Sequence, residues 1–342
     1  MRVTIKSIAE TVGVSRGTVD RALNNRPGIN QEVADKIKKV AEEMGYQPNL
    51  VAKALSNTKV VKKIGIILHS EGNEFFDEVI RGIKDALQEL SRFGLEYEWR
   101  TMEGYNDKMQ EALMEELAVM GISGLVMTPI NSPRIVQKIH ELSEKNIKIV
   151  AINSDILNTE RIAYVGCKHK KSGAVAAGLF GLMSQSKEEH IGIITGNELN
   201  LALERRKLGF LETIKADFPN IHIVDLLRND DNNERSYEAT EKLLKQYPDL
   251  DGLCYLGAGL SGGLKAIREY KEGSALKVVT YDLGKAVKQG LSQNLIAATI
   301  LQEPYKQGFD GVQIMGKYLL FEQLPKHEKN FTELSIVTKY SM

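Results

Sequence analysis

The sequence predicts two parts with different folds: a small all-α unit at the N-terminus, and a two-lobed α/β core built on two doubly wound parallel sheets. Three observations lead to this prediction. Apolar residues recur at helical spacing in three short segments before residue 48. From residue 62 on, short apolar runs alternate with amphipathic helical patterns, which is typical of parallel sheets covered by helices. The chain, at 342 residues, is also too long for one compact core.

The first expected helix begins after Thr4 and ends at Gly13. The Thr4 hydroxyl can accept a hydrogen bond from a free N–H group of the first turn. Gly13 can take the left-handed conformation that ends a helix. The residues at positions i, i+3, i+4 and i+7 form one apolar face: Ile5, Ile8, Ala9 and Val12.

The second expected helix follows a short turn and begins after Ser15, whose hydroxyl can cap it. Its inward face carries Val19, Ala22 and Leu23. Its outward face carries small, polar or charged residues: Arg16, Gly17, Asp20, Arg21 and Asn24. A helix, a glycine-containing turn and a second helix form the arrangement that places the second helix in the major groove of DNA. Three short helices can also form a purely structural bundle.

A third helix is expected after Asn30, which can cap it, and Gly45 and Pro48 end it. Its apolar stripe consists of Val33, Ile37, Val40, Ala41 and Met44. The first 60 residues hold ten Lys/Arg and six Asp/Glu, a net charge of +4, in a chain whose total charge is zero. A basic head on an acidic body fits a nucleic-acid-binding module, although four charges can also belong to a solvated face.

These three helices resemble, along their full length, the helix-turn-helix headpiece of the lactose-repressor (LacI) family. The segments that carry the resemblance are TIKSIAE, GVSRGTV, RALNN, GYQPN and AKAL, in that order. The resemblance implies a DNA-binding headpiece over residues 1–47, followed by a hinge helix and linker over residues 48–61. It implies that Arg16 and Gly17 read bases, while Thr18, Arg21 and Asn24 support base and phosphate contacts.

In this family the hinge helix forms on DNA, and a leucine from each of two hinges wedges into the minor groove. Leu55 matches that leucine within the frame PNxxAxxL, although it can also belong to an ordinary linker. About eight helical residues are marginally stable alone in water, which makes the hinge switchable. The residues expected to contact DNA are Thr4, Ser15, Arg16, Gly17, Thr18, Asp20, Arg21, Asn24, Asn49, Ala52 and Leu55.

Asp20 departs from the family pattern, in which most members carry serine between the valine and the arginine. Its carboxylate can accept a hydrogen bond from cytosine N4 or pair with Arg16 one turn earlier. The operator sequence of another member therefore does not carry over to this chain.

The core is expected to span residues 62–342 as two lobes, the first about 62–157 and 295–322, and the second about 161–283 and 329–342. The predicted crossings between the lobes lie near 155–161, 283–294 and 322–329. Ten strands are expected: residues 64–68, 97–100, 124–128, 149–153, 162–166, 190–195, 221–227, 252–257, 277–282 and 297–302.

This core resembles the periplasmic sugar-binding fold of the ribose-binding type, and the resemblance implies a small-molecule sensor. Ligands of such sheets lie beyond the carboxyl ends of the strands, in the cleft between the lobes. The resemblance places an aromatic pair, a sugar-binding aspartate, an arginine and a glutamine in that cleft. The residues expected to bind the ligand are Asn73, Phe75, Phe76, Asn153, Asp155, Arg206, Asp282 and Gln302.

Several of these positions allow two interpretations. Phe75 or Phe76 can pack in the core at a helix start instead of stacking on a sugar ring. The guanidinium of Arg206 can bind vicinal hydroxyls or a carboxylate. Ser154 stands where the ribose type has an arginine, and Asp155 can compensate. Gly257 and Ala258 replace an expected asparagine, so a polyhydroxylated ligand other than plain ribose is predicted.

Two rival functions have less support. No nucleophile elbow, phosphate-binding GxxxxGK[ST] or HExxH motif points to an enzyme. GAGLSGG at 257–263 can be a phosphate loop, but helix packing is the better interpretation. Cys167 and Cys254 lack metal-ligand spacing, so two reduced thiols are expected, with no metal and no cofactor. A transport-linked solute-binding protein is disfavoured because the N-terminus lacks a secretion signal and carries the headpiece.

The sequence thus predicts a cytoplasmic, sequence-specific transcriptional regulator that is not an enzyme. We expect a homodimer that reads a pseudo-palindromic operator. A monosaccharide or polyol that closes the cleft would change whether the hinge helices can pair. Most of the family represses transcription and some members activate it. The effector, the operator and the direction of the response stay open.

Overall fold

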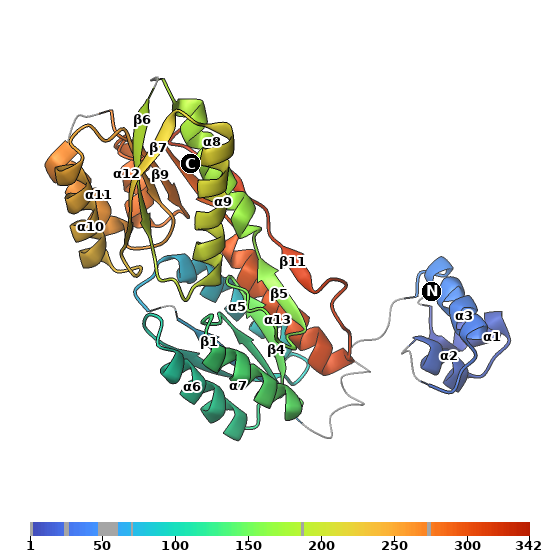
Figure 1. The fold of residues 1–342 in the computed structure, drawn as a ribbon. Helices are drawn as coiled ribbons and strands as arrows, with labels where there is room; N and C mark the ends of the chain where they lie inside the picture. The colour runs from blue at the N-terminus through green and yellow to red at the C-terminus, as the bar shows by residue number, and fades with distance from the viewer. Residues whose placement is uncertain (1–2, 24–26, 47–60, 70, 186–187, 272–274) are drawn as a thin grey trace. The chain divides into compact units, whose positions relative to one another are not determined.

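The computed structural model describes residues 3–23, 27–46, 61–69, 71–185, 188–271 and 275–342. The chain divides into two compact units, Met1–Ser56 and Asn57–Met342 (Figure 1). The first unit contains α1 (Ile5–Val12), α2 (Arg16–Leu23) and α3 (Gln31–Glu43). No helix among the described residues is both long and apolar enough to cross a membrane.

The three helices form where their caps and apolar stripes predict them. The Thr4 hydroxyl accepts a hydrogen bond from the Ser7 N–H at 3.2 Å, and Gly13 ends α1 with φ of 80°. The Asn30 side chain caps α3 through the Glu32 N–H at 2.8 Å. A small core holds the helices together: Ile8, Ala9, Val19, Ala22, Ala34, Ile37 and Ala41 are buried.

The second unit contains two six-stranded sheets. The first has the order β11-β5-β4-β3-β1-β2, and the second has the order β12-β10-β9-β8-β6-β7. The pairings are parallel except that of β10 with β12. The strands are β1 (Lys63–Leu68), β2 (Glu96–Thr101), β3 (Gly124–Met127), β4 (Lys148–Ile152), β5 (Ala163–Gly166), β6 (Glu189–Thr195), β7 (Ile221–Arg228), β8 (Gly252–Tyr255), β9 (Lys277–Tyr281), β10 (Ala298–Leu301), β11 (Lys329–Phe331) and β12 (Ser335–Val337).

Helices pack against each sheet and form its core. The first lobe carries α5 (Phe75–Ser91), α6 (Asp107–Val119), α7 (Pro133–Glu144) and α13 (Pro304–Phe321), in which α5 packs on α13 and α6 on α7. The second lobe carries α8 (His169–Met183), α9 (Leu201–Asp217), α10 (Asn233–Gln246), α11 (Leu260–Lys271) and α12 (Lys285–Ser292). There α8 packs on α9, and α11 packs on both α10 and α12.

The ten predicted strands are all present, but two short strands were missed and the predicted lobe ranges are wrong at their ends. β5 pairs with β4 in the first sheet, and β10 pairs with β9 in the second. The chain therefore crosses between lobes at 167–168, 302–303 and 332–334, not near 155–161, 283–294 and 322–329. The apolar pattern of one strand does not encode which distant strand it will pair with, so the sequence could not place these crossings.

Two glycines allow α8 and α9 to approach each other closely. A Cβ added at Gly173 would lie 1.9 Å from the backbone oxygen of Arg206, and one added at Gly209 would lie 1.9 Å from that of Lys170. The packing thus fixes the distance from α8 to the segment of α9 that carries Arg206.

Gly173→Ala is expected to lower the free energy of unfolding by about 1–3 kcal/mol, because the helices must separate. Gly178→Ala is the matched control on the same helix, since nothing lies within 4 Å of its added Cβ. The control should be neutral, or stabilised by up to about 1 kcal/mol through helix propensity. Urea denaturation of both variants tests this, and equal stability would contradict the close packing.

Candidate functional site

The outward face of α2 carries the side chains that the sequence assigns to DNA. Ser15, Arg16, Gly17 and Arg21 are exposed, whereas Val19 of the same helix is fully buried. The Ser15 hydroxyl oxygen accepts a hydrogen bond from the Thr18 N–H at 3.1 Å and so begins the helix. The helix therefore presents two arginines to solvent, Arg16 in its first turn and Arg21 in its last, where they can reach bases or phosphates.

The remaining DNA-contact predictions divide into three groups. Thr4 is exposed beside the N-terminus of α1. Thr18 and Asp20 are half-buried on α2. Four residues lie outside the described part of the chain: Asn24, Asn49, Ala52 and Leu55. The DNA roles of all these residues stay predictions.

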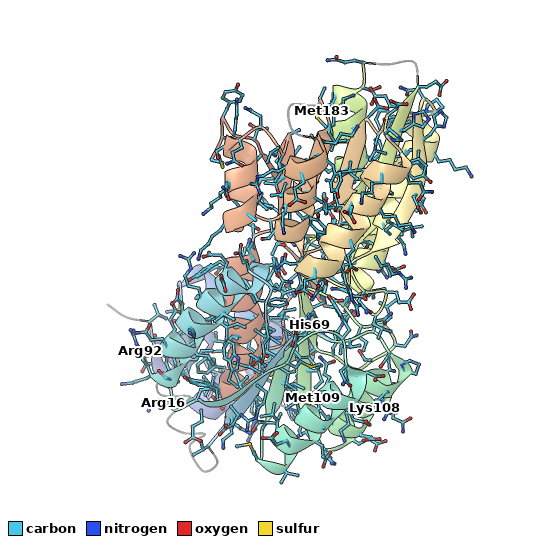
Figure 2. All side chains as sticks on the ribbon, turned by 90° about the vertical axis from the view of Figure 1, so that its left-hand side faces the viewer. Arg16, His69, Arg92, Lys108, Met109 and Met183 are labelled. Carbon is cyan, nitrogen blue, oxygen red and sulfur yellow. The ribbon has the colours of Figure 1, made fainter. Side chains whose placement is uncertain are left out.

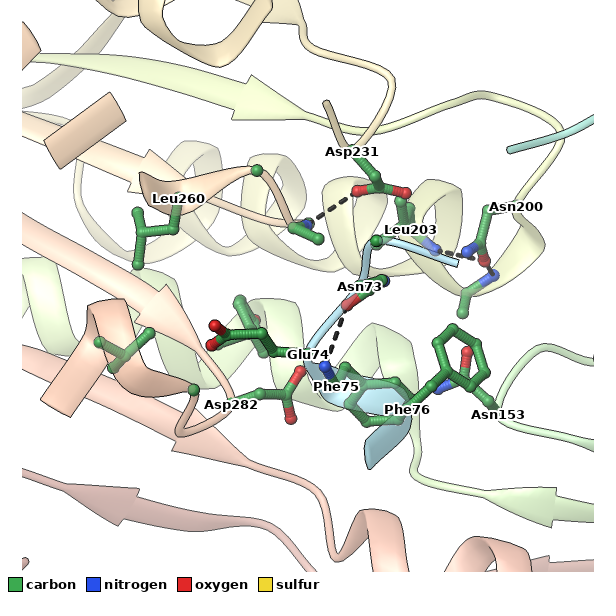
Figure 3. Close-up of a pocket in the computed structure, with 18 of the residues that line it drawn as sticks. Asn73, Glu74, Phe75, Phe76, Asn153, Asn200, Leu203, Asp231, Leu260 and Asp282 are labelled. Carbon is green, nitrogen blue, oxygen red and sulfur yellow. Dashed lines mark hydrogen bonds between the residues drawn. The ribbon is translucent and has the colours of Figure 1, made fainter. Parts of the chain in front are cut away.

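A cavity of about 160 Å³ lies between the two lobes, at the carboxyl ends of the strands (Figure 3). Asn153 follows β4, Asp282 follows β9 and Gln302 follows β10, so each reaches the cavity from the end of a strand. Seven of the eight residues predicted to bind the ligand line it: Asn73, Phe75, Phe76, Asn153, Arg206, Asp282 and Gln302.

Arg206 belongs to a network of polar side chains that line this cavity. Its guanidinium lies 3.7 Å from the ring centre of Tyr281 and donates from Nη1 to the Leu256 oxygen at 2.5 Å. Nη2 donates to Gln302 Oε1 at 3.4 Å. The Gln302 amide donates in turn to both Asp282 oxygens, at 3.0 and 3.2 Å. The side chain of Gln302 thus links the buried guanidinium of Arg206 to the carboxylate of Asp282 by hydrogen bonds.

Burial raises the pKa of Asp282 to about 6, although the Arg206 charge and the Gln302 hydrogen bond oppose the shift. The native carboxyl therefore holds its proton at pH values where the unfolded chain has lost it. The free energy of unfolding consequently falls as the pH rises from about 4 to 6, and it stays lower at neutral pH.

Asp282→Asn should make the ligand-free protein more stable than the parent at pH 7–8, by up to about 3 kcal/mol, because no buried carboxylate remains to be charged. The gain should shrink as the pH falls toward 4 and disappear below it, where the native and unfolded aspartates are both protonated. Urea denaturation of the two proteins from pH 4.5 to 8 measures this difference. Parallel stability curves would contradict the raised pKa.

Aromatic side chains also line the cavity. Phe76 is fully buried, and its ring centre lies 5.1 Å from that of Phe75 and 5.5 Å from that of His69. Figure 2 shows His69 where the two lobes meet. Phe75 is only half-buried. Phe76 is therefore part of the core as well as of the cavity lining, and Phe75 is the more exposed of the two rings.

The two lobes also contact each other directly beside the cavity. Tyr105 of the first lobe donates to Asp231 Oδ2 of the second at 2.6 Å and accepts from the Asn200 amide at 3.0 Å. On the other side, Glu74 accepts a hydrogen bond from the Lys285 N–H at 2.7 Å, where α12 begins. The carboxylate of one lobe thus caps a helix of the other.

The prediction for Asp155 is wrong, because its side chain does not reach this cavity. Asp155 forms a bidentate pair with the buried Arg161, at 2.5 and 2.9 Å, and Arg161 also contacts Glu328 at 2.5 Å. The Asp155 carboxylate thus already has hydrogen-bond donors on both oxygens, from the guanidinium of Arg161 six residues along the chain. Asp155 therefore does not compensate for Ser154.

Sequence reasoning missed several residues of the cavity. The polar ones that matter most are His69, Glu74, Tyr105, Asn200, Asp231 and Tyr281. His69 directly follows β1 and Tyr281 ends β9, so the strand-end rule could have found both. In the glycine-rich loop, a Cβ added at Gly262 would lie 1.7 Å from the Asn233 oxygen, which supports helix packing there.

Comparison with known proteins agrees with both parts of the structure. The family described as "Bacterial regulatory proteins, lacI family" matches residues 4–49, and the family described as "Periplasmic binding protein domain" matches residues 64–323. The probable HTH-type transcriptional repressor ExuR of Bacillus subtilis (strain 168) is 30% identical over 246 residues, 71% of this chain and 69% of that protein.

Two sugar-binding proteins are similar to the core. The D-ribose/D-allose-binding protein of Pseudomonas aeruginosa is 28% identical over 78% of this chain and 85% of its own length. The crystal structure of GanP, a glucose-galactose binding protein from Geobacillus stearothermophilus, superposes with a TM-score of 0.75 at 22% identity, over 83% of this chain and 99% of GanP. With its headpiece, its core and its similarity to a regulator over 71% of its length, the chain belongs to the lacI family of bacterial regulatory proteins and is a DNA-binding transcriptional regulator.

Proposed function

We propose that the core senses a small polyhydroxylated molecule, a sugar or a polyol, and that its occupancy controls operator binding by the headpiece. The observation that carries the proposal is the cavity between the lobes. Its lining combines an aromatic ring, that of Phe75, with a polar network of Arg206, Asp282 and Gln302. A sugar ring presents apolar C–H faces and polar hydroxyl edges, which matches such a lining.

The relatives give this proposal further support. One is named for binding D-ribose and D-allose, another for binding glucose and galactose, and the regulator ExuR is named a probable repressor. We infer a repressor that acts as a homodimer on a pseudo-palindromic operator, so that two headpieces occupy two half-sites. The ligand would favour one of two arrangements of the lobes and thereby change whether the hinges can pair.

A thermal-shift screen against pentoses, hexoses, polyols such as inositol, and sugar phosphates tests the sensor. A ligand at one hundred times its dissociation constant adds about 2.7 kcal/mol to the free energy of unfolding, which such a screen detects. A stabilising compound should then alter the affinity of the full chain for DNA selected from a random pool. Selected DNA that binds without any response to a stabilising compound would contradict control of the operator by the cleft.

A further inference from the structure

The cavity carries more negative than positive charge. Among the described residues that line it, Arg206 is the one cation, whereas Glu74, Asp231 and Asp282 are acids. His69 adds no positive charge near neutral pH, because burial lowers its pKa to about 4. A ligand therefore enters a site whose formal charge is negative.

The Asp231 side chain fits at the edge of the cavity because two neighbouring residues are glycines and have no side chain there. A Cβ added at Gly196 or at Gly257 would lie 2.5 Å from Asp231 Oδ1. That oxygen accepts a hydrogen bond from the Ala258 N–H at 2.8 Å, while Oδ2 accepts from Tyr105. The Asp231 carboxylate thus lies beside Gly257 and Ala258, where the sequence had suggested that polar contacts were missing. No salt bridge among the described residues balances its charge.

The guanidinium of Arg206 is poorly placed to bind an acid. Nη1 is engaged by the Leu256 oxygen and Nη2 by Gln302, and the ring of Tyr281 covers one face. Two of its five N–H groups, one on Nη1 and one on Nη2, are already used by the protein, and Nε has no partner in the described structure. A carboxylate bound bidentately would have to share the fork with these contacts. The buried His69 Nε2 also has no partner in the described structure.

The three acids present the opposite chemistry to a ligand. Asp282 is hydrogen-bonded by one glutamine and keeps lone pairs on both oxygens for further donors. Hydroxyl groups both donate and accept, so they can satisfy Asp282 and Arg206 at once. A carboxylate or phosphate only accepts in its charged form, and it would face Asp231 and Asp282 across a small cavity.

Resting on the proposed function, we propose that the cleft selects an uncharged sugar or polyol and rejects the corresponding sugar acid and sugar phosphate. The specificity comes from the excess of carboxylates and from the engagement of the Arg206 fork by the protein itself. The site selects by repulsion as well as by attraction. The negative charge of Asp231 repels anionic ligands, while its two oxygens already accept hydrogen bonds from the protein and need no contact with a neutral ligand.

Matched ligand sets test this on the full-length protein. The first set contains a neutral sugar, its uronic acid and its phosphate, namely glucose, glucuronate and glucose 6-phosphate. The second set is the corresponding one for galactose. The third is a pair, ribose and ribose 5-phosphate. Calorimetry and thermal shift at pH 7.5 should find a neutral member that binds, with its charged partners weaker by about 100-fold or more.

Asp231→Asn should narrow that ratio by about tenfold or more, because one repelling charge is removed at constant shape. Asp230→Asn is the matched control: it is the neighbouring residue, pairs with Arg235 and the Asn197 amide, and does not line the cavity. It should leave the ratio unchanged.

The outcomes separate the two proposals. An acid or phosphate that binds as tightly as its neutral parent, or more tightly, overturns the charge selection and leaves the sugar-sensing function standing. Equal ratios in Asp231→Asn and Asp230→Asn also overturn it. If no member of any set binds, and no other sugar or polyol of the thermal-shift screen does either, the sugar-sensing function itself falls, and the charge selection with it.

Discussion

Replacing Arg206 with alanine is expected to weaken binding of the cleft ligand by about 100-fold or more, while operator affinity in the absence of ligand stays unchanged. Arg206 is 3% exposed, and its guanidinium donates to Gln302, which in turn donates to Asp282, so its loss would remove one proposed ligand contact and loosen two others. Losing one partner of a buried, charged hydrogen-bond network costs about 2–5 kcal/mol. Ligand titration by calorimetry, with DNA binding measured in parallel, checks both halves of the expectation.

Arg206→Ala also leaves Asp231 and Asp282 without a nearby cation, so the variant can lose stability as well as affinity. Arg206→Lys keeps the charge and removes the planar fork, and it should still lose most of the affinity while retaining the fold. Arg205→Ala is the control, because Arg205 is exposed on the same helix and does not line the cavity. A normal ligand response in Arg206→Lys would show that the planar fork is not needed, and a normal response in Arg206→Ala would show that the ligand binds elsewhere.

Features that depend on local chemistry could be predicted from the sequence. The cap at Thr4, the left-handed Gly13 and the cap at Asn30 each involve residues within one turn, and all three are present. The buried strands are visible as apolar runs. β11 and β12 were missed because three residues are too few for a pattern, and each pairs with a strand far away in the sequence.

The site shows the same division between local and distant information. Asn153, Asp282 and Gln302 stand directly at strand ends, so the strand-end rule located them. Tyr105 and Asp231 lie several residues beyond β2 and β7, and only the packing of two lobes brings them to 2.6 Å from each other. No pattern in either segment announces a contact made 126 residues apart.

The direct contacts between the lobes also bear on how a ligand can control the protein. The contacts of Tyr105 with Asp231 and of Glu74 with Lys285 join the lobes without a ligand. A ligand then acts by adding contacts to an arrangement that the protein itself can reach, which is a shift between existing states. Its effect on the operator cannot exceed the difference between its affinities for the two arrangements.

Arg16→Ala is expected to weaken binding to selected operator DNA by about 30-fold to 10⁴-fold, with a much smaller loss on non-specific DNA. Arg16 is exposed at the first position of α2, the helix that the family places in the major groove. A bidentate arginine–guanine contact discriminates by about 1–3 kcal/mol, and a dimer makes the contact in both half-sites. Fluorescence anisotropy on the two DNAs at fixed salt measures the specificity ratio.

Arg21 on the same helix supplies the comparison that gives this result its meaning. It is exposed in the last turn of α2, where an arginine reaches phosphates, so Arg21→Ala should weaken both DNAs alike and reduce the salt dependence of binding by about two ions, one for each half-site. If Arg16→Ala also weakened both DNAs equally, Arg16 would be a phosphate contact. Base reading would then pass to the short side chains at the start of the helix and to Asp20, the one position there that departs from the family pattern.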